Sequence, residues 1–385
     1  MVRCLVASDI RVLHEGGVAR ATHPAGGYAT FEPLLGVFQA ITVISRESET
    51  QNLTAGPVMT GVGVSHRAVP DYSSFRGLIY TLLPTMRIVW RSLDDHGAAV
   101  VRLPEPLSLV VASMALLRGR TLISNIVADP ATAFATAPQV VGKSVALWTR
   151  ALARRSDAVI YVTKSYLQRL ISVSDQVPQL SRSNAQIPHV NQAPRPCPIG
   201  PVRILCVGTT SRLSKGQDTL LLALAHLRAL GVDAHLTLIG GGDRVEWLRT
   251  ESQSLGLADY CDIRGHVNDP AELTAAYVNA DVFCLLSRSE GLPRAMLEAM
   301  SHGVPAIGST AGGIPELLPD HLCLSDPSPV DVAFTLKDLV SHPATYVQAS
   351  QHALETARTI QESAAPEHLV DFLGSIIKHR SEENS

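Results

Sequence analysis

The sequence lacks several features that mark common classes of protein. Its 385 residues hold six cysteines with no C-x-x-C pair, 5% aromatic residues, and 32 Lys and Arg against 35 Asp and Glu, which gives a net charge of −3. A chain that binds nucleic acid normally carries a basic surplus, so this balance argues against such a partner. Widely separated cysteines, three of them inside strand-like apolar runs, are typical of buried thiols in a reducing compartment.

Long apolar segments are also missing. The longest apolar run, residues 107–117, reaches about half the length of a membrane span. Near the N-terminus, Asp9 falls before a signal-like apolar region is complete. We therefore expect no transmembrane segment, no export signal and a cytoplasmic location.

What the sequence does contain is a regular alternation of β-branched runs with segments of helical spacing. Several of the runs are apolar at every position, as expected for strands whose two faces are both covered by helices. The pattern predicts an α/β fold with parallel sheets. The predicted strands are residues 4–7, 41–44, 98–101, 122–127, 159–162, 204–207, 236–239, 282–286 and 304–307.

A proline-rich stretch divides the chain. Five prolines lie between residues 187 and 201, a density that excludes a helix and predicts an extended linker at 191–201. We expect an N-terminal domain at 1–190 and a second domain at 202–365, each with its own β–α units. Residues 366–385 predict an amphipathic helix that must bury an apolar stripe, and we expect it to return to the N-terminal domain.

The most informative stretch is S-E-G-L-P-R-A-M-L-E-A-M-S-H-G-V-P at residues 289–305. Pro293 suits the first turn of a helix and Gly303 suits its end, so we expect a helix from about 293 to 302. The unpaired amides of its first turn, at residues 294–296, would form an anion site, and a diphosphate is a natural occupant. A nucleotide sugar held there would place its sugar beside Glu290 and its ribose beside Glu298. The alternative is that Glu290 caps the helix and Glu298 faces solvent.

This stretch, followed by S-T-A-G-G-I-P-E at 309–316, resembles the E-x7-E signature of retaining glycosyltransferases of the family-four type. Three further segments resemble motifs of the same family in the same order: V-G-T-T-S-R-L-S-K-G at 207–216, L-I-G-G-G-D at 238–243 and I-R-G-H-V at 263–267. The resemblance implies the GT-B architecture, in which two Rossmann-like, doubly wound parallel-sheet domains face each other across a cleft.

The resemblance also implies roles for individual residues of the second domain. Glu290 would bind hydroxyls of the donor sugar, Glu298 the ribose, and Lys215 the leaving diphosphate. The family places an arginine directly after V-G, where this chain has Thr209; either Arg212 supplies that guanidinium or Lys215 works alone. The other implied donor contacts are Arg264, His266, Val267, Gly291, Leu292, Pro293, Arg294 and Leu297.

The N-terminal half offers fewer candidates. Gly26 and Gly27 follow the first strand after a loop of about 15 residues, where the family has a glycine-rich loop that faces the donor diphosphate. Gly16 and Gly17 are the competing pair, and a plain flexible turn is the alternative for either. Many members carry a histidine where this chain has Asp129, which would orient a hydroxyl or else act as a helix N-cap. Arg102 and Glu105 follow an apolar strand and are candidate acceptor contacts.

The resemblance therefore implies a hexosyltransferase that moves a sugar from a nucleotide-sugar co-substrate, UDP-linked by preference, to a hydroxyl, with retention of configuration. We expect no cofactor and no metal, because no D-x-D pair ends a strand and no histidine-rich ligand cluster is present. The acceptor is left open among a small molecule, a glycan and a lipid-linked sugar, as is peripheral membrane contact. Two alternatives remain: a nucleotide-sugar epimerase of the same architecture, and a non-catalytic nucleotide-binding subunit.

Overall fold

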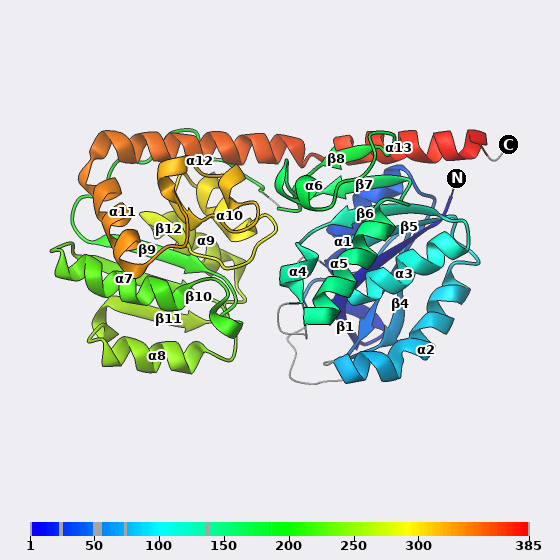
Figure 1. The fold of residues 1–385 in the computed structure, drawn as a ribbon, viewed down its shortest axis with the longest axis horizontal. Helices are drawn as coiled ribbons and strands as arrows, with labels where there is room; N and C mark the ends of the chain where they lie inside the picture. The colour runs from blue at the N-terminus through cyan, green and yellow to red at the C-terminus, as the bar shows by residue number, and fades with distance from the viewer. Residues whose placement is uncertain are drawn as a thin grey trace. The chain divides into compact units, whose positions relative to one another are not determined.

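The computed structural model describes residues 2–22, 26–48, 56–72, 75–134, 139–185 and 187–383. The chain forms two compact units (Figure 1). Unit 1 consists of Met1–Arg182 with Ala365–Ser385, and unit 2 consists of Ser183–Ala364. Each has its own hydrophobic core.

Unit 1 is built on one sheet with the strand order β4-β3-β1-β5-β6-β7-β8, all parallel, and β2 pairs antiparallel with β1. Its strands are β1 (Cys4–Glu15), β2 (Val18–Ala21), β3 (Ile41–Glu47), β4 (Val64–Pro70), β5 (Ala98–Leu103), β6 (Thr121–Ile126), β7 (Ala158–Tyr161) and β8 (Gln179–Ser181). Its helices are α1 (Tyr28–Phe31), η2 (Glu32–Gly36), α2 (Phe75–Ser92), α3 (Pro106–Leu117), α4 (Pro130–Ala133), α5 (Gln139–Ala153), α6 (Tyr166–Leu170) and α13 (Pro366–Glu383).

Unit 2 is a second doubly wound parallel sheet with the strand order β11-β10-β9-β12-β13-β14. Its strands are β9 (Val202–Val207), β10 (Ala234–Ile239), β11 (Cys261–Gly265), β12 (Val282–Leu285), β13 (Ala306–Ser309) and β14 (Cys323–Leu324). Its helices are η3 (Ser211–Leu213), α7 (Gln217–Ala229), α8 (Val245–Ser254), η4 (Ala258–Tyr260), α9 (Pro270–Asn279), α10 (Arg294–Ser301), η5 (Ile314–Glu316), η6 (Asp320–Leu322), α11 (Pro329–Ser341) and α12 (Pro343–Ser363).

The strand orders tell where ligands can bind. In unit 2 the order reverses between β9 and β12, and in unit 1 it reverses between β1 and β5. At such a switch point the loops after the two strands run in opposite directions and leave a crevice at the carboxyl edge of the sheet. Each unit therefore has one topologically defined place for a ligand.

The nine predicted strands all exist, and the α/β prediction is confirmed. The prediction of a loop directly after residues 4–7 is wrong. Strand β1 continues to Glu15, turns through Gly16 and Gly17 at positive φ, and returns as β2. The polar residues of the outer half of β1 hide this extension, because they break the apolar run after Ala7.

The predicted division of the chain differs from the observed one at the linker. The structure assigns residues 183–201 to unit 2, where Ile187 and Val190 are buried in the core. The guanidinium of Arg195 donates to the carbonyls of Ala280 and His302 at 2.7 and 2.8 Å. Backbone carbonyls accept these bonds, so a segment with few N–H donors of its own is still held against unit 2.

The C-terminal helix α13 belongs to unit 1. Leu373 and Ile376 are buried in the core of that unit, and Arg380 forms an ion pair with Asp157 at 2.9 Å. A Cβ atom at Gly36 would lie 3.1 Å from the side chain of Val370, which shows how closely η2 approaches the helix. Among the described residues, no helix has the length and apolar composition needed to cross a bilayer.

Candidate functional site

The switch point of unit 2 brings together two residues that the sequence separates by 75 positions. Lys215 follows β9 through η3, and Glu290 follows β12. The Lys215 Nζ lies 2.5 Å from Glu290 Oε1, and the hydroxyl of Ser287 donates to the same oxygen at 2.8 Å. The two charged side chains are 20% and 10% exposed, so the pair is screened from water yet still reaches the surface.

Two glycines fix the backbone around this pair. Gly216 has φ of 72°, and a Cβ there would lie 2.3 Å from the carbonyl oxygen of Leu286. Gly312 has φ of 63°, and its Cβ would lie 2.2 Å from the carbonyl oxygen of Glu290. Only glycine fits such close approaches in the left-handed region. The loops that carry Lys215 and Glu290 are therefore held in one arrangement by backbone contact.

Helix α10 begins directly after this corner, with Pro293 at its N-cap. The sequence places Pro293 one residue further into the helix; the observed helix is Arg294–Ser301, and Gly303 ends it at φ of 72°. The first-turn amides of an α-helix have no acceptor within the helix, and the positive end of the helix dipole lies at the same point. An anion beside Lys215 would meet both.

Glu298 lies on the second turn of α10 and does not face open solvent. Its Oε2 accepts a hydrogen bond of 2.8 Å from the hydroxyl of Tyr277 on α9. Burial raises the pKa of Glu298, while the hydrogen bond from Tyr277 and the charge of Arg294 partly offset the shift. The solvent-face alternative for Glu298 is therefore wrong, because the carboxyl group is half-buried and accepts a hydrogen bond from Tyr277, a residue that no sequence motif singled out.

The glycine turn after β10 packs against the loop after β9. Gly240 has φ of 148°, and a Cβ there would lie 1.9 Å from the carbonyl oxygen of Gly208. The hydroxyl of Thr209, where the family has arginine, donates to the carbonyl of Gly241 at 3.1 Å. Thr209 therefore closes the turn instead of extending toward Glu290. Arg212 lies in η3, and its side chain is outside the described part of the structure.

The remaining candidates of unit 2 surround this corner with different exposure. Arg264 is paired with Asp262 at 2.6 Å, and His266 is exposed beside Gly241. Leu297 is fully buried in the core, so its side chain packs and any contact with a ligand would come from its backbone. The half-buried or buried candidates are Val267, Gly291, Leu292 and Pro293; Arg294 is exposed.

The switch point of unit 1 holds a denser polar network, which the sequence did not predict. Arg46 at the end of β3 contacts Asp9 at 3.1 Å and Asp71 at 3.4 Å. The hydroxyl of Tyr72 donates to Asp9 Oδ1 at 2.5 Å, and the Arg46 guanidinium lies 4.6 Å from the centre of the Tyr72 ring. Burial raises the pKa of Asp9, and the Arg46 charge opposes that shift.

Two predicted acceptor candidates belong to this network. Glu105 Oε2 accepts the backbone N–H of Asp9 at 2.9 Å, which links β1 to the residues after β5. Its Oε1 accepts from Arg102 Nε at 3.2 Å. Burial raises the pKa of Glu105, and the Arg102 charge lowers it. Arg102 and Glu105 are therefore already paired with each other.

Asp129 is the N-cap of α4. Its Oδ1 accepts the N–H of Ala131 at 2.8 Å, and Oδ2 accepts the hydroxyl of Tyr166 at 3.3 Å. The N-cap alternative thus describes one of its two oxygens. Gly26 and Gly27 are buried, and a Cβ at Gly26 would lie 2.5 Å from the Cβ of Ala21. That contact is with the β1–β2 hairpin and gives Gly26 a packing reason to be glycine.

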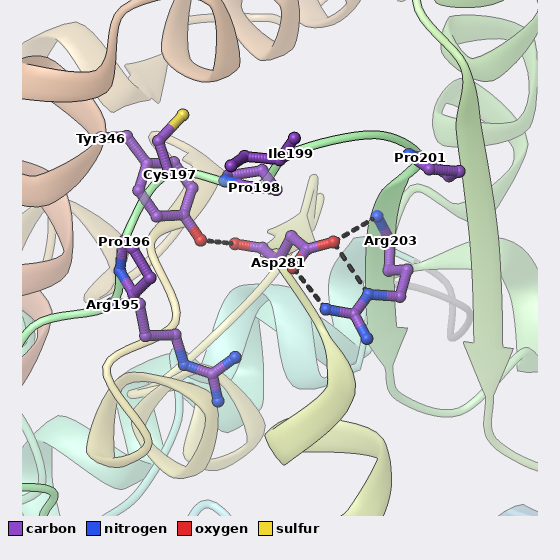
Figure 2. A pocket seen from close by; sticks show the side chains of 9 residues that line it. All are labelled: Arg195, Pro196, Cys197, Pro198, Ile199, Pro201, Arg203, Asp281 and Tyr346. Atoms are coloured by element: carbon purple, nitrogen blue, oxygen red, sulfur yellow. Dashed lines mark hydrogen bonds and ion pairs between the residues drawn. The ribbon is translucent and has the colours of Figure 1, made fainter.

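A separate cavity of about 670 Å³ lies at the opposite edge of the unit 2 sheet (Figure 2). Arg203 at the start of β9 forms an ion pair with Asp281, directly before β12, at 2.7 Å, and the Tyr346 hydroxyl donates to the carbonyl of Asp281. Because ligands of doubly wound sheets collect at the carboxyl edge, this amino-edge cavity is distinct from the Lys215–Glu290 corner. Among the described residues, no group of three His, Cys, Asp or Glu side chains is placed to hold a metal ion.

Comparison with known proteins identifies the second half of the chain. Residues 196–356 match the family Glycosyl transferases group 1. Protein CapJ of Staphylococcus aureus is 22% identical over 284 residues, which is 72% of each chain. A GDP-mannose-dependent alpha-(1-6)-phosphatidylinositol monomannoside mannosyltransferase of Mycobacterium tuberculosis is 40% identical over 109 residues, 26% of this chain and 28% of the relative.

Solved structures resemble the whole chain. Anabaena Alr3699/HepE in complex with UDP and glucose has a TM-score of 0.71 at 16% identity and covers 97% of this chain and 100% of its own. Sucrose-phosphate synthase of Thermosynechococcus elongatus has a TM-score of 0.69 at 16% identity and covers 100% of both. Two parallel-sheet α/β units of this kind constitute the GT-B fold. The matches indicate a glycosyltransferase of the hexosyltransferase type with a GT-B fold, whose residues 196–356 are similar to the group 1 glycosyltransferases.

Proposed function

We propose that the protein is a retaining glycosyltransferase that transfers a sugar from a nucleotide-sugar donor to an acceptor hydroxyl. The observation that carries the proposal is the Lys215–Glu290 contact of 2.5 Å at the switch point of unit 2, next to the first turn of α10. The cation and the helix N-terminus match a diphosphate, and the carboxylate beside them matches a hydroxyl-rich sugar. Glu298, on the second turn of the same helix, matches a ribose.

The diphosphate binds at the N-terminus of α10 and takes Lys215 as its counter-ion. Lys215 then exchanges its present partner, Glu290, for the phosphate. Glu290, held by Ser287, is released to accept hydrogen bonds from hydroxyls of the donor sugar. Glu298 lies about 6 Å along the helix from Arg294, at 1.5 Å per residue, and accepts from the ribose hydroxyls.

The chemistry follows from this arrangement. The bond from the sugar's anomeric carbon to the β-phosphate oxygen breaks, and a bond to the acceptor oxygen forms on the same face of the sugar. The acceptor proton passes to the leaving phosphate oxygen. Lys215, Arg212 and the α10 amides stabilise the charge that develops on the diphosphate, in the manner of fixed hydrogen-bond donors at a developing anion. No cofactor and no metal take part in this scheme.

UDP is the proposed nucleotide. Support comes from the structural neighbour HepE, whose structure contains UDP, whereas the mycobacterial relative is described as GDP-mannose-dependent. Arg264, His266 and Val267 are proposed to lie near the base. In unit 1, Asp129, Arg102 and the Gly26–Gly27 backbone are proposed substrate contacts, and the acceptor is a small molecule, a glycan or a lipid-linked sugar. Fully buried thiols such as Cys206 and Cys284 support a reducing, cytoplasmic setting.

The first test is a thermal-shift panel of UDP-, GDP- and dTDP-sugars with the full chain. A ligand at 100 times its dissociation constant stabilises the folded state by about 2.7 kcal/mol. UDP-sugars are expected to raise the melting temperature most. If none of the three nucleotide classes shifts it, the donor assignment is wrong.

The second test uses Glu290→Gln with Glu246→Gln as its control, because Glu246 is 80% exposed on α8. Release of nucleoside diphosphate from the stabilising donor, with a panel of acceptors, is expected to be lost in Glu290→Gln and unchanged in the control. Equal turnover of both variants contradicts the role of Glu290. Conversion of the donor to an isomeric nucleotide sugar without acceptor would instead identify an epimerase, and binding without any conversion would identify a non-catalytic subunit.

A further inference from the structure

Helix α2 of unit 1 has an apolar stripe turned outward. Ile79, Leu83, Met86 and Trp90 recur at intervals of four, three and four residues, the spacing of one helix face. That stripe normally packs on a core, yet Ile79 is 55%, Leu83 66% and Trp90 41% exposed. Tyr80, next to the stripe, is 83% exposed.

The inner face of α2 mixes apolar and hydroxyl side chains. Thr85, Val89 and Ser92 are buried, and Leu82 and Ile88 are half-buried. The hydroxyl of Ser92 donates to the carbonyl of Ile88 within the same helix. The outer stripe with Ile79, Leu83 and Trp90 nevertheless stays exposed in the described structure.

The exposed apolar surface continues across two more helices. Helix α3 packs against both α2 and α5, and Figure 1 shows the three helices on one side of unit 1. The Arg118 guanidinium at the end of α3 lies 4.6 Å from the centre of the Trp90 ring. On the other flank, Trp148 of α5 donates its indole N–H to Ser113 of α3 at 3.1 Å. Further exposed apolar residues on α3 and α5 are Leu117, Val140 and Leu147.

Basic residues accompany this surface. The sequence of α2 contains arginines and no acidic residue, and Arg87 and Arg91 are exposed one turn apart beside the stripe. From residue 106 to 155 the only acidic residue is Asp129, whereas Lys143, Arg154 and Arg155 are exposed on and directly after α5. Asp94 and Asp95 follow α2, and Asp94 forms an ion pair with Arg118. The surface of α2, α3 and α5 is therefore apolar and basic together.

We propose that the outer surface of α2, α3 and α5 docks unit 1 onto an anionic lipid bilayer. An interfacial helix carries Trp and Leu on one side and Lys or Arg at the margin, and it lies in the headgroup layer without crossing it. Trp and Tyr favour that layer because an apolar ring and a polar tip are satisfied together. The basic residues select anionic headgroups, and their charge is the argument for lipid over an apolar protein partner. The proposal does not depend on the donor site of unit 2.

The test is flotation of the full chain with phosphatidylcholine vesicles, with and without phosphatidylglycerol. Binding is expected only with the anionic lipid and is expected to weaken in high salt. Replacing Leu83 and Trp90 by serine is expected to lower the vesicle affinity by at least about tenfold, because two exposed apolar side chains no longer enter the interface. Phe334→Ser, at an exposed residue of α11 in unit 2, serves as the control.

A second comparison tests the contribution of charge with the double variant Arg87→Gln/Arg91→Gln. Its control is Arg169→Gln/Lys378→Gln, which removes two exposed charges elsewhere in unit 1. At about 1 kcal/mol per basic residue near an anionic surface, the first pair is expected to lose about thirtyfold in vesicle affinity, and the control little. All exchanged side chains are exposed, and melting temperatures verify that each variant folds.

Fluorescence gives an independent readout. The chain has three tryptophans, and Trp247→Phe leaves Trp90 and Trp148, both on the proposed surface. Its emission is expected to shift to the blue on anionic vesicles and to stay unchanged on neutral ones. Failure of the folded wild-type chain to bind anionic vesicles, or equal binding of the Leu83/Trp90 variant, overturns the proposal. Self-association lost in that variant, without vesicle binding, would assign the surface to a second copy of the chain.

Discussion

The two switch points have the same topology but hold their charges differently. In unit 2, Lys215 and Glu290 have few competing partners among the described residues, although this pair is as buried as the Arg46–Asp9 pair of unit 1. In unit 1, Arg46 is shared by Asp9, Asp71 and the carbonyl of Tyr72. A ligand can bind Lys215 by replacing one ion pair, whereas a ligand that binds Arg46 would have to replace several contacts. We infer that the unit 2 corner is arranged for exchange and the unit 1 network for rigidity.

The largest expected effect is on stability, at Arg46. Arg46→Met leaves Asp9 in a buried position without its main counter-charge, and removal of one partner of a buried ion pair costs about 3–5 kcal/mol. Because Arg46 lowers the pKa of Asp9, the loss is expected to shrink as the pH falls and Asp9 is protonated. Urea unfolding at several pH values measures this loss in the free energy of unfolding.

The control for Arg46 is Arg20→Met, since Arg20 is 38% exposed and its pair with Glu15 at 3.4 Å is open to water. A pair of that kind contributes about 0–1 kcal/mol. If Arg46→Met costs no more than this control, the unit 1 network is not the rigid element that the comparison requires.

Lys215→Met is expected to affect turnover more than stability, in contrast to Arg46→Met. Loss of a fixed cation at the leaving diphosphate lowers turnover by about 10²–10³-fold, by analogy with the removal of one donor from an oxyanion site. The melting temperature is expected to fall less than that of Arg46→Met, because the printed partner of Lys215 is one carboxylate, whereas Arg46 contacts Asp9, Asp71 and the carbonyl of Tyr72. Steady-state kinetics with Lys378→Met as control measure the effect; a large drop in stability with normal turnover would reverse the assignment.

Glu298→Gln tests the second carboxylate of the unit 2 site. Burial raises the pKa of Glu298, so the folded state prefers the protonated form. The associated stability is present below the ordinary pKa and is lost as the pH rises through the raised value. Glutamine carries no charge, so the variant is expected to match the wild type in acid and to melt at a higher temperature than the wild type at neutral pH.

The same variant is expected to bind UDP about tenfold more weakly, since hydrogen bonds to a charged acceptor contribute about 1.5–3 kcal/mol. It is also expected to lose discrimination between UDP and 2′-deoxy-UDP. Calorimetry at neutral pH tests both points, with Glu246→Gln as control. A variant that is less stable than the wild type at neutral pH, or that keeps the discrimination, would show that Glu298 is structural.

Tyr277→Phe has the smallest expected effect. It removes the hydroxyl that donates to Glu298 at 2.8 Å and is expected to weaken UDP binding severalfold. Because that bond lowers the pKa of Glu298, the acid limb of the binding profile should move to higher pH. Tyr346→Phe removes a comparable buried hydroxyl bond of 2.7 Å at the amino-edge cavity and should change stability only. Equal effects of the two variants on UDP binding would exclude a positioning role for Tyr277.

The same contrast explains how much the sequence could predict. Glu290, Glu298 and α10 lie within one short stretch, so local spacing was sufficient to locate them. The unit 1 network is assembled from Asp9, Arg46, Tyr72 and Glu105, which no short motif connects. Tyr277 could not be selected either, because a tyrosine on a helix becomes informative only when the fold brings it to Glu298. The roles of the site residues stay predictions.

The extended β1–β2 hairpin was missed for a related reason. Polar residues such as Asp9 and Arg11 in its outer half resemble a loop when they are read without their partners. The ion-pair partners of Asp9 and Arg11 are Arg46 and Asp71, 37 and 60 positions away. Tertiary ion pairs, and not local apolar periodicity, account for those residues, so sequence periodicity alone ends the strand too early.

The proposed donor site requires a diphosphate at the Lys215 corner, and calorimetric titration with UDP and with uridine tests this most directly. UDP is expected to bind at least about 100-fold more tightly than uridine, a difference of about 2.7 kcal/mol. Lys215→Met should remove most of that difference while leaving the affinity for uridine unchanged. Equal affinity of the wild type for UDP and uridine, or an undiminished preference for UDP in Lys215→Met, would contradict the account.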